Sequence, residues 1–169
     1  MAKDDSTESQ ALTRQQIIDR AMSFPMEDVV TRYAKDHDLP LSVAQDHERE
    51  LKRYLALFAI NPDTKYGMRG QIDELWHTFL MFTKEYAQFC NQVAGRFIHH
   101  VPATTLPKQG TAKEYERFLT DYEAVYAEPS PPELWPRITR PSDEEESLTP
   151  ANSCDGCSMC GGGPHCVVD

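Results

Sequence analysis

The sequence is poor in the features that would direct it to a membrane or to nucleic acid. No apolar run reaches the roughly 18 residues that a membrane-spanning helix needs, and the opening MAKDDSTESQ lacks the basic and apolar regions of a secretory signal. Positive charge is also scarce, because 17 Lys and Arg stand against 27 Asp and Glu, for a net charge of −10. Binding to a phosphate backbone depends on clustered Lys and Arg. We therefore expect a cytosolic protein with no membrane and no nucleic-acid partner.

Strand patterns are missing as well, since no segment alternates convincingly between polar and apolar residues. A chain of 169 residues with 40% hydrophobic content supports one compact domain and leaves room for a tail. Apolar residues recur at helical spacing instead, so the expected class is all-α: a small irregular bundle of about six helices with a disordered Cys/Gly-rich C-terminal tail. The expected helices cover 14–23 (capped by Thr13), 25–37, 43–61, 70–82, 83–94 (capped by Thr83) and 112–128 (opened by a capping box of Thr111 and Glu114).

Composition divides the chain into four regions. They are a disordered N-terminus (1–11), a helical domain (12–128), a Pro/acidic linker (129–150) and a Cys/Gly-rich tail (151–169). Within the linker, proline and charge indicate an extended chain, in which Leu134 and Trp135 are the residues able to dock onto the domain.

The run QIDELWHTFLMFTKEYAQFC, residues 71–90, places polar, chemically active side chains on an apolar helix. At about 100° per residue, Asp73 and His77 are neighbours one turn apart at the edge of the apolar stripe. Asp73 could orient the imidazole through a hydrogen bond, or it could bind a metal ion itself, and both interpretations stay open.

Cys90 lies thirteen residues beyond His77, so one unbroken helix would point the two side chains about 220° apart. A shared site therefore requires a break in the helix. We place the break at Thr83, where a cap would start a second helix that folds back as a hairpin and brings Cys90 towards His77.

Gly95 is placed to end this second helix, after which the chain would return His99 or His100 to the same neighbourhood. The candidate ligands of the domain are Asp73, His77, Cys90, His99 and His100. They offer oxygen, nitrogen and sulfur donors of the kinds that zinc, iron or copper accept. The alternative is packing, because a Cys on an apolar face is usually a small core residue and a boundary His is usually hydrogen-bonded.

The residues D-E-L-W-H-T-F-L-x-F-T-x-x-Y-x-x-F-C and G-R-F-I-H-H-V-P resemble the small helical domain of the glycine-rich domain-containing protein family. The family's core would map here onto Asp73, Trp76, His77, Tyr86, Cys90 and Gly95, with His99-His100 as in the bacterial version. The Gly/Cys-rich C-terminus fits the family's Gly-rich ending. The resemblance implies no defined biochemical activity. Plant members of the family look like regulatory or stress-associated proteins. It does favour a metal site, because an Asp, a His and a Cys in a family pattern are hard to explain by packing alone.

The C-terminal stretch CDGCSMCGGGPHC concentrates soft metal ligands. They are Cys154, Cys157, Cys160, His165 and Cys166. In a reducing cytosol these residues indicate thiols or metal ligands rather than disulfides, and they are enough for one zinc or Cu(I) ion. Iron–sulfur ligation is disfavoured because no further Cys-Pro follows the CxxCxxC run. The alternative is a disordered tail that is redox-inert or that oxidises on handling.

Three function classes remain. The first is a cytosolic metal-binding or metal-handling protein whose tail captures, shields or relays the ion. The second is a helical interaction or regulatory module without metal, and the third is a precursor whose Cys-rich C-terminal peptide is modified by a partner enzyme. No separate nucleophile or general-base pair stands out, so enzymatic activity is not supported. His37 and His47, in polar helical stretches, are expected at the surface or its boundary.

Overall fold

The computed structural model describes residues 12–68, 70–101 and 108–137, and these residues form helices and connecting segments without a strand. The helices are α1 (Arg14–Ser23), α2 (Glu27–Asp36), α3 (Leu41–Ile60), α4 (Gln71–Met81), α5 (Thr83–Ala94) and α6 (Lys108–Tyr126). The expected all-α class and six helices are therefore confirmed. The disorder expected for 1–11 and for the tail falls outside the described residues. None of the described helices is long and apolar enough to cross a membrane.

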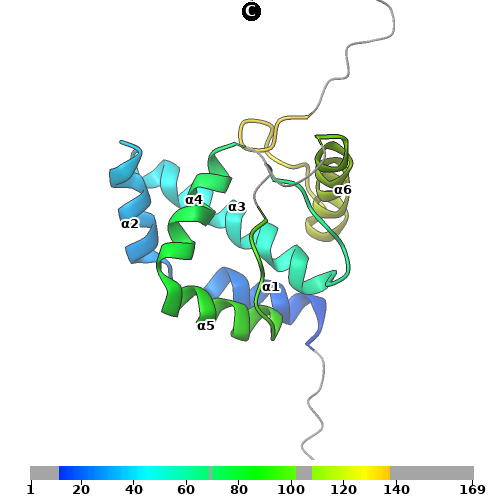
Figure 1. Cartoon of the computed structure of the whole chain (residues 1–169), viewed down its shortest axis with the longest axis horizontal. Coiled ribbons are helices and arrows are strands. Elements are labelled where there is room, and N and C mark those ends of the chain that lie inside the picture. The colour runs from blue at the N-terminus through cyan, green and yellow to red at the C-terminus, as the bar shows by residue number, and fades with distance from the viewer. Residues whose placement is uncertain (1–11, 69, 102–107, 138–169) are drawn as a thin grey trace, which may run out of the picture. The chain divides into compact units, whose positions relative to one another are not determined.

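The longest helix, α3, organises the domain, because it contacts each of the other five helices. In Figure 1 it passes behind α4, while α5 lies along α1. A helix with neighbours on so many sides buries residues around most of its circumference, including polar ones. Those buried in α3 are Ala44, His47, Glu50, Leu51, Lys52, Tyr54, Leu55, Ala56 and Leu57.

His47 shows the consequence of this central position. It is 1% exposed, and its Nδ1 lies 2.9 Å from the hydroxyl of Tyr33, which also donates a hydrogen bond to the Gln71 carbonyl at 3.2 Å. The expectation of a surface or boundary residue is wrong for His47, because α2 and the start of α4 cover the side of α3 on which it lies. Burial lowers the pKa of its imidazole from the ordinary value of 6.5.

The helix starts follow the local sequence only in part. At α1, Thr13 Oγ1 accepts from the Gln16 N–H at 3.2 Å, and Gln16 returns a hydrogen bond to the Thr13 N–H, so the expected cap is confirmed. At α5, the cap is Phe82 and makes no side-chain hydrogen bond, so the cap expected at Thr83 is wrong. The capping box expected at Thr111 is wrong too, because α6 begins earlier, at Lys108.

The C-terminal segment beyond α6 joins the core through Trp135. This side chain is 0% exposed, and its ring stacks on Tyr54 at 5.8 Å and meets Phe118 edge-on at 4.6 Å. The expected docking of Trp135 is thus confirmed, and Leu134 packs beside it, partly buried. The described chain remains part of the helical domain through Arg137, beyond the boundary at 128 drawn from composition.

A buried carboxylate fixes this docking. Glu50 is 0% exposed, and its Oε2 accepts hydrogen bonds from the Trp135 indole N–H and the Tyr122 hydroxyl, both at 2.9 Å. Its Oε1 accepts from Arg53 Nη1 at 3.3 Å. α3, α6 and the C-terminal segment are therefore joined at one point by a carboxylate whose oxygens are all paired.

Candidate metal centre

The first two predicted ligands lie on α4, which begins after Gly70. Gly70 has φ of +80°, in the left-handed region that favours glycine, and its carbonyl accepts a hydrogen bond from the Asp73 N–H at 3.2 Å. The buried stripe of α4 consists of Ile72, Leu75, Trp76, Thr78 and Phe79. Asp73 and His77 lie beside this stripe with side chains 32% and 47% exposed, so both reach solvent from the edge of the core.

A break separates α4 from α5, as the sequence requires for any hairpin here. Phe82 leaves the helical region with φ −86° and ψ 66°, and it both ends α4 and precedes the first residue of α5. The two helices contact each other, and the buried face of α5 carries Tyr86, Phe89, Cys90 and Val93. The predicted break is therefore present, one residue before Thr83 and without its cap.

After α5, the chain turns back along the domain as a return segment, residues 96–101. Gly95 ends α5 with φ of +65°, as its position in the sequence predicts. Arg96 Nη2 then donates to the carbonyls of Phe58 at 2.8 Å and Pro62 at 3.3 Å, which ties the start of the return segment to the end of α3.

The backbone of Ile98 is held from two sides within the return segment. Its N–H donates to Cys90 Sγ at 3.5 Å. Its carbonyl accepts from the Tyr86 hydroxyl at 2.5 Å, and that hydroxyl accepts from the Trp76 indole N–H at 3.1 Å. Because both polar groups of this buried backbone are paired, the position of His100, two residues further along, is fixed relative to α4.

The return segment places His100 against the edge of α4. Its Nε2 lies 2.9 Å from Asp73 Oδ1, and its ring meets Trp76 edge-on with centroids 4.5 Å apart. The ring of His77 lies 4.5 Å from that of His100, and His77 Nδ1 is 4.0 Å from Asp73 Oδ2. One ligand atom from each of these three residues lies within 4.8 Å of the other two. We call Asp73, His77 and His100, as a candidate ligand set for a metal ion, the metal triad.

The metal triad contains three of the five ligands predicted for the domain. His99 points elsewhere, exposed and with its ring 5.0 Å from that of Phe97. Cys90 is outside the triad as well: it is 1% exposed, it bonds to Ile98, and burial raises the pKa of its thiol. A protonated thiol is a poor metal ligand. In this structure Cys90 supports the segment that carries His100 and does not face His77 across a common ligand sphere.

The donor set of the metal triad fits a divalent transition metal. Two imidazoles and a carboxylate are ligands that zinc and iron(II) accept in protein sites. With bonds of about 2.0–2.1 Å, tetrahedral ligand atoms lie about 3.4 Å apart. The ligand atoms of the triad lie within 4.8 Å of one another, so an ion would replace the 2.9 Å hydrogen bond between His100 and Asp73, and the half-exposed side chain of His77 has solvent into which it can rotate.

The tail ligands predicted from the CxxCxxC run fall outside the described residues. They are Cys154, Cys157, Cys160, His165 and Cys166. Their ligation therefore remains a prediction of the sequence.

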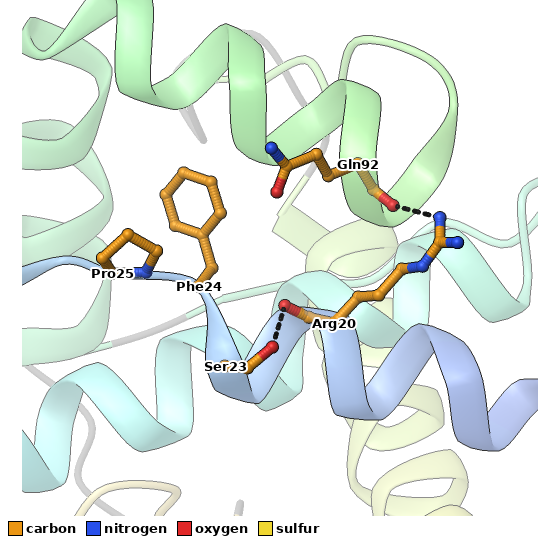
Figure 2. A pocket seen from close by; sticks show the side chains of 5 residues that line it. All are labelled: Arg20, Ser23, Phe24, Pro25 and Gln92. Atoms are coloured by element: carbon orange, nitrogen blue, oxygen red, sulfur yellow. Dashed lines mark hydrogen bonds between the residues drawn. The ribbon is translucent and has the colours of Figure 1, made fainter.

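A separate cleft of about 260 Å³ lies between α1 and α5, lined by Arg20, Ser23, Phe24, Pro25 and Gln92 (Figure 2). Its one charged side chain, Arg20, donates to the Gln92 carbonyl at 3.1 Å, which joins the two helices. The lining contains no acid, His or Cys. We therefore assign the cleft to helix packing.

Comparison with known proteins places the chain in a protein family. A family model described as UCP032817-like covers residues 13–123. This is more than half of the 169 residues, so the chain belongs to that family. No curated protein and no solved structure matches the chain.

The family match corrects the resemblance drawn from the D-x-x-W-H pattern. That resemblance to the glycine-rich domain-containing protein family is wrong, because the family that matches is UCP032817-like and no glycine-rich domain family is shown. The description of the matching family names no activity. The support that the resemblance gave to a metal site falls away with it, and the case for a metal site rests on the geometry of the metal triad.

Proposed function

We propose that this protein binds a divalent metal ion, zinc or iron(II), through the metal triad of its helical domain. One observation carries the proposal: an imidazole from α4, an imidazole from the return segment and a carboxylate from α4 place their donor atoms within 4.8 Å of one another. These groups lie 27 residues apart in sequence at their extremes, so the fold, and not local spacing, brings them together.

The exposed member of the metal triad supports this interpretation over simple packing. His100 has a structural role of its own, because its side chain is only 10% exposed and it contacts both Trp76 and Asp73. His77 does not, since its side chain is 47% exposed and its nearest carboxylate oxygens, on Glu74 and Asp73, lie 3.9 and 4.0 Å away. Those distances exceed hydrogen-bond length, so the contacts of His77 inside the domain are its ring contact with His100 and weak ion pairs at the surface, and they bury little of its side chain.

Binding would exchange protons for the ion. A metal ion bonds to the unprotonated nitrogen of an imidazole and to an ionised carboxylate, so any proton held between His100 and Asp73 leaves to solvent when the ion enters. Asp73 then serves either as the third ligand or as the group that orients the ring of His100. Both roles need the carboxylate, so loss of Asp73 weakens binding in either case.

Metal analysis of the full-length protein, purified without a His-tag or chelator, tests the proposal. Because the triad provides one site, we expect about one equivalent of zinc or iron per chain. His77→Ala and His100→Ala should remove this equivalent. His99→Ala is the matched control, because His99 is the adjacent exposed histidine outside the triad, and it should leave the metal content unchanged. Equal metal content in all four proteins, or none in the wild type after incubation with either ion, would remove the proposal.

Two further functions follow from the sequence and stay as proposals. A helical interaction module is what remains if metal binding fails, and Met81 and Phe97, 61% and 47% exposed, are apolar side chains that such a partner could cover. A precursor with a modified Cys-rich tail is tested by the intact mass of the protein from its native cells, where an unmodified chain would count against it. A cytosolic location, proposed from the sequence, would keep the tail thiols reduced in either case.

A further inference from the structure

We infer that the side chain of Glu74 supplies the fourth ligand to the ion held by the metal triad. This inference rests on the proposed metal binding and adds to that site a residue that the triad does not include. With four protein ligands the site would be closed to water, as structural metal sites are, and its ion would join α4 to the return segment.

The metal triad by itself leaves one position of a tetrahedral ion open. Three donors occupy three corners, and the fourth corner is left to water or to another side chain. Two ligands expected from the sequence do not fill it, because the buried Cys90 thiol bonds to the Ile98 N–H and the ring of His99 lies against that of Phe97. A fourth protein ligand therefore has to come from another side chain beside the triad.

Glu74 lies beside the triad because of its position on α4. It precedes His77 by three residues and Asp73 precedes it by four, so both carboxylates lie one helical turn from that histidine. His77 Nδ1 is 3.9 Å from Glu74 Oε2 and 4.0 Å from Asp73 Oδ2. The same imidazole nitrogen is thus flanked by two carboxylates at nearly equal distances.

These distances fit an ion between the three groups. Donor atoms around a tetrahedral zinc ion lie about 3.4 Å apart, from bonds of about 2.0–2.1 Å. Both distances from His77 Nδ1 exceed that spacing by about 0.5 Å. They are too long for direct hydrogen bonds, and an ion bonded to Nδ1 would draw both carboxylates closer.

The side chain of Glu74 has the freedom that this movement requires. It is 56% exposed, more than the side chain of Asp73 or of His77. Its backbone, in contrast, is held within α4, where the Glu74 carbonyl accepts a hydrogen bond from Thr78 Oγ1 at 3.0 Å. The carboxylate can therefore turn towards the ion while its attachment to α4 stays fixed.

Two carboxylates also balance the charge of the ion. Asp73 and Glu74 carry one negative charge each, which together match a divalent cation, while the two imidazoles bind as neutral groups. When Glu74 binds, an oxygen of its carboxylate replaces a water on the ion, and no proton or electron is transferred. The ion then links α4 and the return segment at a site without an open position.

Glu74 also occupies a position that needs no metal ion to explain it. Acidic residues are favoured in the first turn of a helix, where they interact with the helix dipole, and Glu74 lies in the first turn of α4. A nearby charge would moreover raise the affinity for a cation without bonding to it. The test must therefore show whether a ligand position on the ion is open.

Cobalt(II) binding followed by visible absorption provides this test, because the spectrum of bound cobalt changes when an anion such as azide replaces a water on the ion. We use the full-length chain with its tail cysteines replaced, so that no tail thiolate contributes, and call it the tail-serine chain: Cys154→Ser, Cys157→Ser, Cys160→Ser and Cys166→Ser. It is compared with the same chain carrying Glu74→Ala and with one carrying Glu85→Ala. Glu85→Ala is the matched control, because it removes the same charge from an exposed position in the first turn of α5.

The tail-serine chain and the Glu85→Ala variant should each bind one cobalt, with a spectrum that sodium azide does not change. Glu74→Ala should bind cobalt at least about 100-fold more weakly, since loss of a group that only orients a ligand already costs about 10- to 100-fold. Its spectrum should change when azide is added, because the anion replaces the water that has taken the place of Glu74.

An azide response in the tail-serine chain would reveal an open position and overturn the inference, and this outcome can be observed even if Glu74→Ala binds no cobalt. Weaker binding by Glu74→Ala with an unchanged spectrum and no azide response would overturn it too, because Glu74 would then act through its charge alone. In both cases the bound cobalt leaves the proposed function intact. Absence of cobalt binding in the tail-serine chain would overturn the inference and the proposed function together.

Discussion

Two carboxylates, Glu50 on α3 and Asp73 on α4, each join distant parts of the chain, yet their surroundings differ in kind. Glu50 is fully buried and accepts hydrogen bonds from an indole, a phenol and a guanidinium, which as protonated donors are not metal ligands. Asp73 is partly exposed and faces two imidazoles, which do bind metal ions. Both oxygens of Glu50 are hydrogen-bonded inside the core. Asp73 and its two neighbouring imidazoles, in contrast, could still bind a metal ion.

The comparison shows that the partners of a carboxylate, and not its presence near a core, indicate its role. A buried carboxylate that is surrounded by hydrogen-bond donors stabilises the fold, because each donor loses its acceptor if the carboxylate is removed. A carboxylate among imidazoles at the surface contributes little to packing and can bind an ion.

Glu50→Ala should destabilise the fold by about 3–5 kcal/mol, because it leaves Trp135, Tyr122 and Arg53 without their shared acceptor. Chemical denaturation measures this change in the free energy of unfolding. Asp46→Ala is the control, since Asp46 is an exposed residue of the same helix paired with Arg49, and it should change that free energy by less than about 0.5 kcal/mol. Similar values for the two variants would contradict a structural role for Glu50.

Cys90→Ala should weaken zinc binding by about 10- to 100-fold without changing the stoichiometry, as is usual when a group that orients a ligand is lost. The reason is that the Ile98 N–H loses its acceptor, and the return segment then holds His100 less firmly. Competition titration with a chromophoric chelator measures the affinity. Cys90→Ser, which retains an acceptor, should recover part of it. Complete loss of the bound equivalent in Cys90→Ala would instead identify Cys90 as a ligand.

His100→Ala and His77→Ala should differ in stability although both remove metal binding. Loss of His100 removes a ring contact with Trp76 and a hydrogen bond to Asp73, which together cost about 1–2 kcal/mol. Loss of the half-exposed His77 should cost less than about 0.5 kcal/mol in metal-free buffer. Thermal unfolding in the presence of chelator makes the comparison, and equal costs would show that His77 has a packing role we have not assigned.

His47 should make the fold less stable at acid pH. Burial lowers its pKa in the folded state below the ordinary value of 6.5, so the unfolded chain binds a proton more readily than the folded one. Stability is then full above pH 6.5 and falls as the pH drops below that value, by at most about 1.4 kcal/mol per pH unit.

His47→Asn provides the matched comparison for this pH dependence. Its amide can take the place of the Nδ1 that bonds to Tyr33, but it does not titrate. Denaturation midpoints between pH 7 and pH 5 should therefore change less in the variant than in the wild type. Parallel curves would assign the acid sensitivity to other groups.

The sequence predicted the helices well because apolar residues at a spacing of 3.6 determine which stretches are helical. It placed Asp73 beside His77 correctly by helical geometry, and the break between α4 and α5 is present, although it was inferred from a site shared by His77 and Cys90 that the structure does not show. These features depend on neighbours within one or two turns. Spacing alone therefore contains enough information to predict them.

Features that depend on which segments meet in space were not predictable in the same way. Spacing could not choose between His99 and His100, because the choice depends on the hydrogen bonds that hold Ile98. Nor could it show that Cys90 would point to that backbone and not to a metal. The burial of Glu50 could not be predicted for the same reason, since its partner Trp135 lies 85 residues away in the sequence.

The most direct test of the account is a two-bond ¹H–¹⁵N correlation spectrum of the histidine side chains, recorded on the full-length protein before and after one equivalent of zinc. The account predicts that the imidazole nitrogens of His77 and His100 move to positions typical of metal-bound rings, while those of His37, His47 and His99 stay in place. No movement at His77 and His100, or equal movement at His99, would contradict it.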